Sequence, residues 1–482
     1  MVSIRSLTAS FLRMGLAGPP VDVRPLAEWA PMTSVMWFRR DLRLADNPAL
    51  VEACAEDGVL PLFVIDPRLW GPAGAPRRAY LTASLRSLDA SLHQRKARLH
   101  LRRGDPVTEV ARAARAVGAT RVHIAADHGP YGTQRDQDVE AALAERDVEL
   151  VRTGSAYAVA PGRVTNRAGE PFKVFTPFAR AWAEHGWRGP VDAPRGVTWL
   201  DADGAVDLPE PRTPSGIDLP EAGEAAAGRR WREFLDERVA AYDDDRDKPG
   251  IDGTSRMSVH LKWGEIHPRT MLADLARLRS SGATTYRKEL AWREFYADVL
   301  FHRPATAREY LRPEYAGMEY DAPDGAFDAW RDGRTGFPVV DAGMRQLRAT
   351  GWMHNRVRMI VASFLVKDLH VEWQHGARHF LRWLVDGDLA SNQHGWQWVA
   401  GCGTDAAPYF RVFNPTTQGR KFDPDGAYVR RWVTELGELD AGADPHDPDE
   451  ESRQRVDYPA PIVDHAEERR EALRRWEQIR AG

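Results

Sequence analysis

The chain has 482 residues, 43% hydrophobic and 28% charged, which predicts a globular protein of two or three domains with an ample apolar core. It has no run of about 18 apolar residues that would predict a membrane span, and its two cysteines, Cys54 and Cys402, argue against a disulfide framework or a metal site and fit a reducing cytoplasm. The formal net charge of -4 does not exclude a nucleic-acid partner, because binding depends on a local basic groove.

Residues 1–31 differ in composition from the rest of the chain. They contain Arg5, Arg13 and Arg24, no acidic residue before Asp22, and the pair Pro19-Pro20. Arg13 interrupts the apolar part, so a secretory signal fits poorly. We expect a non-structural extension or an upstream start with Met32 as the true first residue, with a targeting peptide as the alternative.

Residues 32–160 alternate between short apolar runs and helical patterns. This alternation predicts an α/β domain with a doubly wound parallel sheet. No GxGxxG motif follows the first run, so a dinucleotide is not expected there in the usual way. The strands are expected at 35–38, 60–65, 98–101, 121–125 and 148–151, and helices at 79–92 and 106–117.

Proline, glycine and acidic residues dominate residues 161–228, which we interpret as an interdomain linker. Within it, residues 170–182 are apolar enough to pack. Strand signals fade after Gly228, so residues 229–482 are predicted to form an all-helical domain.

Two helical-domain segments carry polar groups suited to a ligand. Thr254, Ser255 and Ser258 surround Arg256, and hydroxyls with free backbone amides suit a phosphate, although such residues are also ordinary helix caps. In residues 286–300, helical spacings of three and four place four polar and aromatic side chains on one face: Glu289, Trp292, Arg293 and Tyr296. That face predicts either a solvated charged surface beside a core tryptophan, or a ligand-binding cleft.

Residues 351–417 combine charge with apolar surface. Arg356 and Arg358 adjoin the apolar run 359–366, and Asp386 and Asp388 flank a single glycine. Buried charge needs a partner, so we expect an Arg–Asp pair within this segment. Four tryptophans also fall within 26 residues: Trp373, Trp383, Trp396 and Trp398.

Several long motifs then resemble the DNA photolyase and cryptochrome family, in its class I cyclobutane pyrimidine dimer photolyase branch. They are WFRRDLRLADN, GTSRMS, ELAWREFY, GRTGFPVVDAGMRQL, WMHNRVRM, DGDLASNQHGWQW and GTDAAPYFRVFNPTTQG, spread from about Val35 to about Arg470. The resemblance implies blue-light-dependent repair of pyrimidine dimers in DNA by electron transfer from photoexcited reduced FAD. A cryptochrome-type blue-light photoreceptor is the alternative, and a tryptophan-rich helical protein without a ligand is a third.

The resemblance also implies the residues that hold reduced, anionic FAD. Arg358 and Asp386 would pair near the isoalloxazine, Asp388 would accept from a ring NH, and Asn392 would face flavin N5. An amide there adds no negative charge, which favours a photolyase, as does the short C-terminal tail. The full cofactor set is Tyr242, Thr254, Ser255, Arg256, Met257, Ser258, Tyr286, Glu289, Arg293, Arg358, Asp386, Gly387, Asp388 and Asn392.

For the flipped-out lesion, the resemblance implies that Trp292 and Trp398 flank the dimer while Glu289 and Asn355 bond to its edges. Asn355 matches the dimer-repair branch rather than the (6-4) branch. The implied catalytic set is Glu289, Trp292, Asn355, Met359, Asn392 and Trp398. The implied DNA contacts are Arg246, Trp292, Arg293, Asn355, Arg356, Trp398 and Thr417, with Arg411 as a further candidate.

Two further features follow from the resemblance. The family's electron relay matches Trp396 and Trp373, but its third position falls on Tyr320, so either Tyr320 or another aromatic such as Trp330 ends the relay. A deazaflavin antenna is favoured over methenyltetrahydrofolate by FVIDPRLW and ADHGPYGTQRDQD, with Arg77 and Asp127 as polar contacts or, alternatively, as surface or turn residues. We expect a monomer that acts on damaged DNA.

Overall fold

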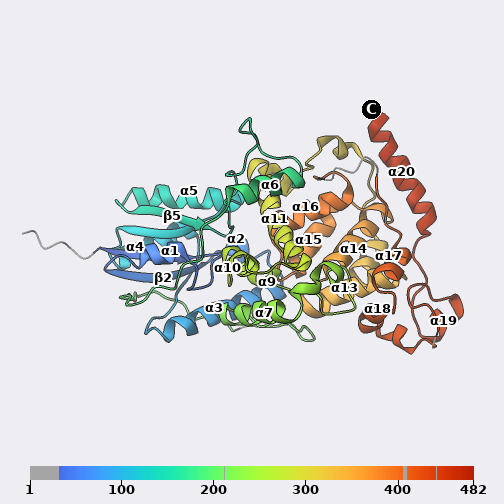
Figure 1. The fold of residues 1–482 in the computed structure, drawn as a ribbon, viewed down its shortest axis with the longest axis horizontal. Helices are drawn as coiled ribbons and strands as arrows, with labels where there is room; N and C mark the ends of the chain where they lie inside the picture. The colour runs from blue at the N-terminus through green and yellow to red at the C-terminus, as the bar shows by residue number, and fades with distance from the viewer. Residues whose placement is uncertain (1–31, 211, 405–409, 441, 482) are drawn as a thin grey trace, which may run out of the picture. The chain divides into compact units, whose positions relative to one another are not determined.

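The computed structural model describes residues 32–210, 212–404, 410–440 and 442–481 (Figure 1). The extension predicted for residues 1–31 lies outside the described residues. From Met32 onwards the chain forms one unit, in which a parallel sheet comes first and helices follow.

The sheet has five parallel strands in the order β3-β2-β1-β4-β5, which confirms the predicted doubly wound sheet. Its third strand begins at His100, two residues later than the pattern predicted. Chain order reverses direction at β1, which pairs with β2 on one side and β4 on the other. The strands are β1 (Thr33–Phe38), β2 (Gly58–Ile65), β3 (His100–Arg103), β4 (Arg121–Ala126) and β5 (Glu149–Ser155).

Alternate residues of β1 explain why helices cover both faces of the sheet. Met36 and Phe38 join one buried apolar cluster, and Val35 and Trp37 join another, because successive side chains of a strand point to opposite faces. The first cluster includes residues of α1 and α3, and the second includes residues of α4 and α5. These helices, with the short α2, are α1 (Pro48–Ala53), α2 (Pro67–Trp70), α3 (Ala75–His93), α4 (Pro106–Ala116) and α5 (Pro130–Ala144).

Among the described residues, the predicted linker contains the helix α6 (Phe175–His185) and the first turn of α7. As expected for residues 170–182, this segment packs: the ring of Phe178 lies 5.2 Å from that of Phe295, and Trp182 donates a 2.5 Å hydrogen bond to Glu294. The next helix, α7, begins at Glu224, shortly before the predicted start of the helical domain.

Helices make up the rest of the chain, around a core in which Ile360, Phe364 and Leu365 of α14 are almost fully buried. No helix among the described residues is long and apolar enough to span a membrane. The helices are α7 (Glu224–Glu237), α8 (Tyr242–Asp245), α9 (Ser258–Trp263), α10 (Pro268–Leu275), α11 (Ser281–His302), α12 (Gly325–Asp332), α13 (Pro338–Thr350), α14 (Asn355–Lys367), α15 (Trp373–Trp383), α16 (Leu389–Ala400), α17 (Pro415–Phe422), α18 (Ala427–Trp432), α19 (Glu450–Arg455) and α20 (His465–Ala481), with short 3-10 turns that include η2 (Pro304–Ala307) and η3 (Pro313–Gly317).

Candidate functional site

A buried ion pair joins α14 to the turn between α15 and α16. Arg358 Nη2 lies 2.8 Å from Asp386 Oδ2, so the predicted Arg–Asp pair is present. Arg358 Nε also donates to the Met353 carbonyl, which holds the guanidinium in place. The other carboxylate oxygen of Asp386 is buried and has no hydrogen-bond partner among the described residues. A buried acceptor left this way suits an N–H group of a ligand.

Asp388 connects the two halves of the chain. Its Oδ1 caps α16 by accepting from the Ser391 backbone N–H, and its Oδ2 lies 2.5 Å from Arg40 Nη2, just after β1. Burial alone would raise the pKa of Asp388, but Arg40, Lys262 and Arg293 outweigh burial and hold it well below its usual range. The carboxylate is therefore ionised.

The amide of Asn392 is oriented by its neighbours. Its Nδ2 donates to the Ala377 carbonyl at 3.1 Å and to Gln393 Oε1 at 2.8 Å. Gln393 donates its own amide N–H to the Ala307 carbonyl, so its oxygen faces Asn392. Both N–H groups of Asn392 are thus engaged, and its carbonyl oxygen is left as an acceptor.

The predicted phosphate loop, residues 254–258, contains a strained residue. Arg256 adopts a φ of 54°, a left-handed conformation that non-glycine residues rarely adopt. Ser255 Oγ contacts Tyr286 Oη at 2.7 Å and accepts from the Met257 N–H at 3.2 Å, while the rings of Tyr242 and Tyr286 lie 5.1 Å apart. Such strain persists where surrounding structure over-determines it, commonly at ligand sites.

Two neighbouring residues after α8 bridge α11 and α14. Arg246 Nη1 lies 2.6 Å from Glu289 Oε1 of α11, and Asp247 Oδ2 lies 2.7 Å from Arg356 Nη2 of α14. Burial raises the pKa of Glu289, although Arg246 opposes the shift. Asn355, the exposed first residue of α14, and Met359, whose sulfur lies 3.8 Å from Arg356 Nη1, belong to the same rim. The predicted lesion contacts Glu289, on α11, and Asn355, on α14, therefore lie on one rim that Arg246 and Asp247 connect.

Trp292 and Arg293 of α11 have different surroundings. The Trp292 ring stacks on Phe175 of α6, with centroids 3.7 Å apart and planes 7° apart, so one of its faces is covered. Arg293 instead donates to the Ala156 and Leu261 carbonyls. Its guanidinium thus ties the chain just after β5 to α9, although the resemblance assigned it to DNA and cofactor.

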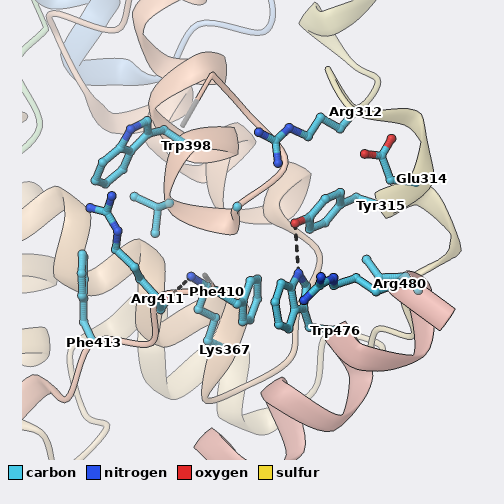
Figure 2. A pocket seen from close by; sticks show the side chains of 13 residues that line it. Arg312, Glu314, Tyr315, Lys367, Trp398, Phe410, Arg411, Phe413, Trp476 and Arg480 are labelled. Carbon is cyan, nitrogen blue, oxygen red and sulfur yellow. Dashed lines mark hydrogen bonds between the residues drawn. The ribbon is translucent and has the colours of Figure 1, made fainter. Parts of the chain in front are cut away.

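Trp398 lines a pocket of about 280 Å³ on the helical half (Figure 2). The Arg411 guanidinium lies 5.3 Å from the centre of the Trp398 ring, a cation–π contact. Thr417, another predicted DNA contact, is exposed in the first turn of α17. Trp476 and Arg480 also line the pocket, although the sequence did not single them out. The only sequence feature that pointed to them was the charged, tryptophan-containing pattern near the C-terminus.

The residues of the predicted electron relay lie in the helical core. Trp373 and Trp396 are 0% and 3% exposed, and their indole N–H groups have no partner among the described residues. Trp330 also approaches Trp396, with ring centroids 6.2 Å apart. The Tyr320 hydroxyl is buried and makes no hydrogen bond of normal geometry with the described residues.

The two predicted antenna residues contact protein groups. Arg77 donates to the carbonyls of Leu381 and Gly387, so it joins α3 to the loop that carries Asp386. Asp127 accepts from the Gly129 N–H and lies 3.5 Å from Arg135. Burial acts to raise the pKa of Asp127, but the neighbouring arginines together have the larger effect. The net pKa lies below the usual value, so the carboxylate stays ionised. Arg40 is a functional residue that the sequence pattern did not reveal, because its only signal was its place in WFRRDLRLADN.

A doubly wound α/β domain is joined to a helical region through the Arg40–Asp388 ion pair. The helical region has a buried Asp386 oxygen without a partner among the described residues and a strained loop suited to phosphate, which together define a cofactor-binding protein. Residues 34–195 match the family described as DNA photolyase, and residues 286–478 match the FAD binding domain of DNA photolyase. The chain belongs to the DNA photolyase and cryptochrome family, as an enzyme of the photolyase type whose helical half binds FAD.

Relatives are similar over almost their full length. The deoxyribodipyrimidine photo-lyase of Streptomyces griseus is 43% identical over 90% of this chain and 97% of its own, and that of Escherichia coli is 38% identical over 93% and 99%. Among solved structures, a class III photolyase from Agrobacterium tumefaciens has a TM-score of 0.87 at 34% identity, covering 95% of this chain and all of its own. A Synechocystis cryptochrome has a TM-score of 0.85 at 25% identity, over 93% and 99%.

Proposed function

We propose that the protein repairs cyclobutane pyrimidine dimers in DNA by light-driven electron transfer from reduced FAD, as a class I photolyase. The observation that carries this proposal is the orientation of the Asn392 amide. Both of its N–H groups donate to protein acceptors, so its carbonyl oxygen is the atom that remains to accept a hydrogen bond. In reduced flavin N5 carries a hydrogen, so an acceptor at that position stabilises the reduced cofactor that repair needs.

The remaining cofactor residues fit the same group. The ring N–H that the resemblance assigned to Asp388 is instead bonded by Asp386, because both Asp388 oxygens are already engaged while one Asp386 oxygen has no partner among the described residues. Arg358 compensates the charge of the reduced ring. The backbone around Arg256 and the hydroxyls of Thr254 and Ser258 hold the pyrophosphate. Bound FAD, once reduced and excited by blue light, supplies the electron that splits the dimer.

The rim between α11 and α14 receives the lesion after it leaves the duplex. Trp292 offers the ring face that Phe175 does not cover, and Trp398 flanks the lesion from the other side. Glu289, whose pKa is raised by burial, donates a hydrogen bond from its protonated carboxyl to a pyrimidine carbonyl, and Asn355 bonds to another edge. Arg246 and Arg356 contact phosphates, exchanging their present carboxylate partners for them.

Repair of a dimer-containing oligonucleotide tests this proposal. We expect reduced, FAD-loaded protein to restore intact thymines under blue light and not in darkness. Asn355→Ala should weaken both lesion binding and repair, whereas Asn166→Ala, in an exposed turn of the linker, should change neither. Absence of light-dependent repair by fully reduced, FAD-loaded protein would contradict the proposal.

A cryptochrome-type photoreceptor is the second candidate, favoured by the likeness to the Synechocystis cryptochrome. This function predicts a light-dependent change of shape or partner binding without repair.

We further propose a monomer in solution and a deazaflavin antenna. Mass spectrometry of extracted chromophores and light scattering test these two points independently of repair.

A further inference from the structure

Tyr310 lies beside Trp373 and is bonded to a carboxylate. The two ring centroids are 6.1 Å apart at an interplanar angle of 84°, and Tyr310 Oη donates a 2.6 Å hydrogen bond to Glu372 Oε1. Tyr310 comes from the segment between η2 and η3, whereas Glu372 immediately precedes Trp373 at the start of α15. Tyr310 and Glu372 thus place a phenol and a carboxylate base next to the buried indole of Trp373.

Trp373 is connected to Trp396 through a close approach of α15 and α16. Gly376, three residues after Trp373, faces the Trp396 ring so closely that a Cβ there would lie 2.1 Å from Trp396 Cη2. Both tryptophans are almost fully buried, but Tyr310 and Glu372 are only half-buried. The path from Trp396 through Trp373 to Tyr310 therefore leads from the core towards solvent.

A tyrosine gives up an electron readily only if its proton can leave, because the oxidised phenol is a strong acid. The Tyr320 hydroxyl is buried beside the Tyr310 hydroxyl, and no carboxylate among the described residues is bonded to it. Trp330 is fully buried, and its N–H donates to the Val361 carbonyl, which is too weak a base to take a proton. Tyr310, in contrast, already points its hydroxyl at a carboxylate.

We propose that Tyr310 is the final electron donor when the oxidised cofactor is photoreduced, and that Glu372 takes the phenol proton. Trp396 gives one electron to the light-excited oxidised flavin, and Trp373 then gives one to Trp396. Tyr310 gives one electron to the oxidised Trp373 as its O–H bond breaks, and the proton moves to Glu372 Oε1. The products are a neutral tyrosyl radical and a neutral carboxylic acid.

This proton movement makes the charge separation last. Return of the electron would require the proton to come back at the same time, and half-buried Glu372 can pass that proton to water. Burial, together with Tyr320 and Glu372, raises the pKa of the Tyr310 hydroxyl, so its proton stays in place until oxidation. The inference rests on the proposed function only in requiring bound FAD that absorbs light.

Transient absorption after a laser flash, on protein loaded with oxidised FAD, tests the inference. We expect the spectrum of a neutral tyrosyl radical, formed more slowly in heavy water. Tyr310→Phe should abolish that spectrum and leave a tryptophan radical that decays faster. Glu372→Gln should slow tyrosyl formation about a hundredfold, the scale of a lost general base, and added buffer base should partly restore it.

Two further variants distinguish the alternatives. Tyr131→Phe, which removes a tyrosine bonded to Asp66 in the α/β half, is the matched control and should keep the tyrosyl signal. A signal that survives Tyr310→Phe but disappears in Tyr320→Phe would overturn the inference, as would a wild-type spectrum showing tryptophan radicals alone. FAD content and melting temperature show that each variant is folded.

Repair by chemically reduced wild-type protein separates this inference from the proposed function. If tyrosyl radicals form at Tyr310 but no dimer is repaired, the relay stands and the repair function fails. If dimers are repaired but Tyr310→Phe leaves the flash spectrum unchanged, the repair function stands and the inference fails.

Discussion

Arg358 and Asp386 form a 2.8 Å ion pair that leaves the second carboxylate oxygen of Asp386 buried and without a described partner. If that oxygen accepts from FAD, Asp386→Asn should weaken FAD binding about tenfold to a hundredfold, because hydrogen bonds to charged groups contribute about 1.5–3 kcal/mol. Fluorescence of released FAD measures the change. Asp332→Asn, in a half-exposed pair with Arg348, is the control and should have no effect. Unchanged FAD affinity in Asp386→Asn would exclude this contact.

The carbonyl of Asn392 is expected to stabilise reduced flavin. Asn392→Leu removes the acceptor, so the two-electron midpoint potential of bound FAD should become more negative. Loss of one hydrogen bond of about 1.4 kcal/mol corresponds to about 30 mV. Spectroscopic redox titration measures this shift, with Asn166→Leu as the control. A potential equal to that of the wild type would place Asn392 away from N5.

Glu289 should make lesion binding depend on pH. Burial raises its pKa, so the protonated, donating form persists above the usual carboxylic range. Affinity for a dimer-containing oligonucleotide should be full below that raised pKa and fall about tenfold as pH rises through it, the effect of one lost hydrogen bond. Glu289→Gln keeps an N–H donor at every pH and should give a flat profile. Binding in darkness, compared with an undamaged oligonucleotide, measures both profiles; equal pH dependence in the two proteins would refute this role.

Arg356 and Arg293 are expected to behave differently. Arg356→Gln should reduce affinity for damaged and undamaged DNA alike and lower the slope of log affinity against log salt by about 1, since one phosphate contact is lost. Arg293→Met should leave that slope unchanged. It should instead lower the free energy of unfolding by about 1–3 kcal/mol, because the Ala156 and Leu261 carbonyls lose their donor. Binding titrations at several salt concentrations and thermal unfolding separate the two outcomes.

Local pattern was sufficient to predict much of the fold. The apolar run 35–38 predicted a strand of a doubly wound parallel sheet, and the structure shows that strand in the middle of the sheet. The spacing of Glu289 and Trp292 likewise predicted the α11 helix. These predictions succeed because a strand or helix repeats its side-chain directions every few residues, so the signal lies within one segment.

Charged partners within one segment, residues 351–417, were also predictable, as the Arg358–Asp386 pair shows. Partners from distant segments were not. Arg40 and Asp388 are 348 residues apart, and Arg77 binds the Gly387 carbonyl from 310 residues away. Arg293 was placed on a candidate binding face by helical spacing, but backbone carbonyls just after β5 and in α9 supply its acceptors. Helical spacing gives the direction of a side chain, not what lies opposite it.

The sequence by itself determined the family and the order of a parallel α/β domain followed by a helical region, because these are written in local periodicity and ordered motifs. Only the tertiary structure decided which polar atoms are already bonded. Among the described residues it leaves one oxygen of Asp386 without a partner, engages both N–H groups of Asn392 so that its carbonyl oxygen remains an acceptor, and pairs Tyr310 with Glu372. Those outcomes depend on distances of a few ångströms between segments that meet only when the apolar core closes.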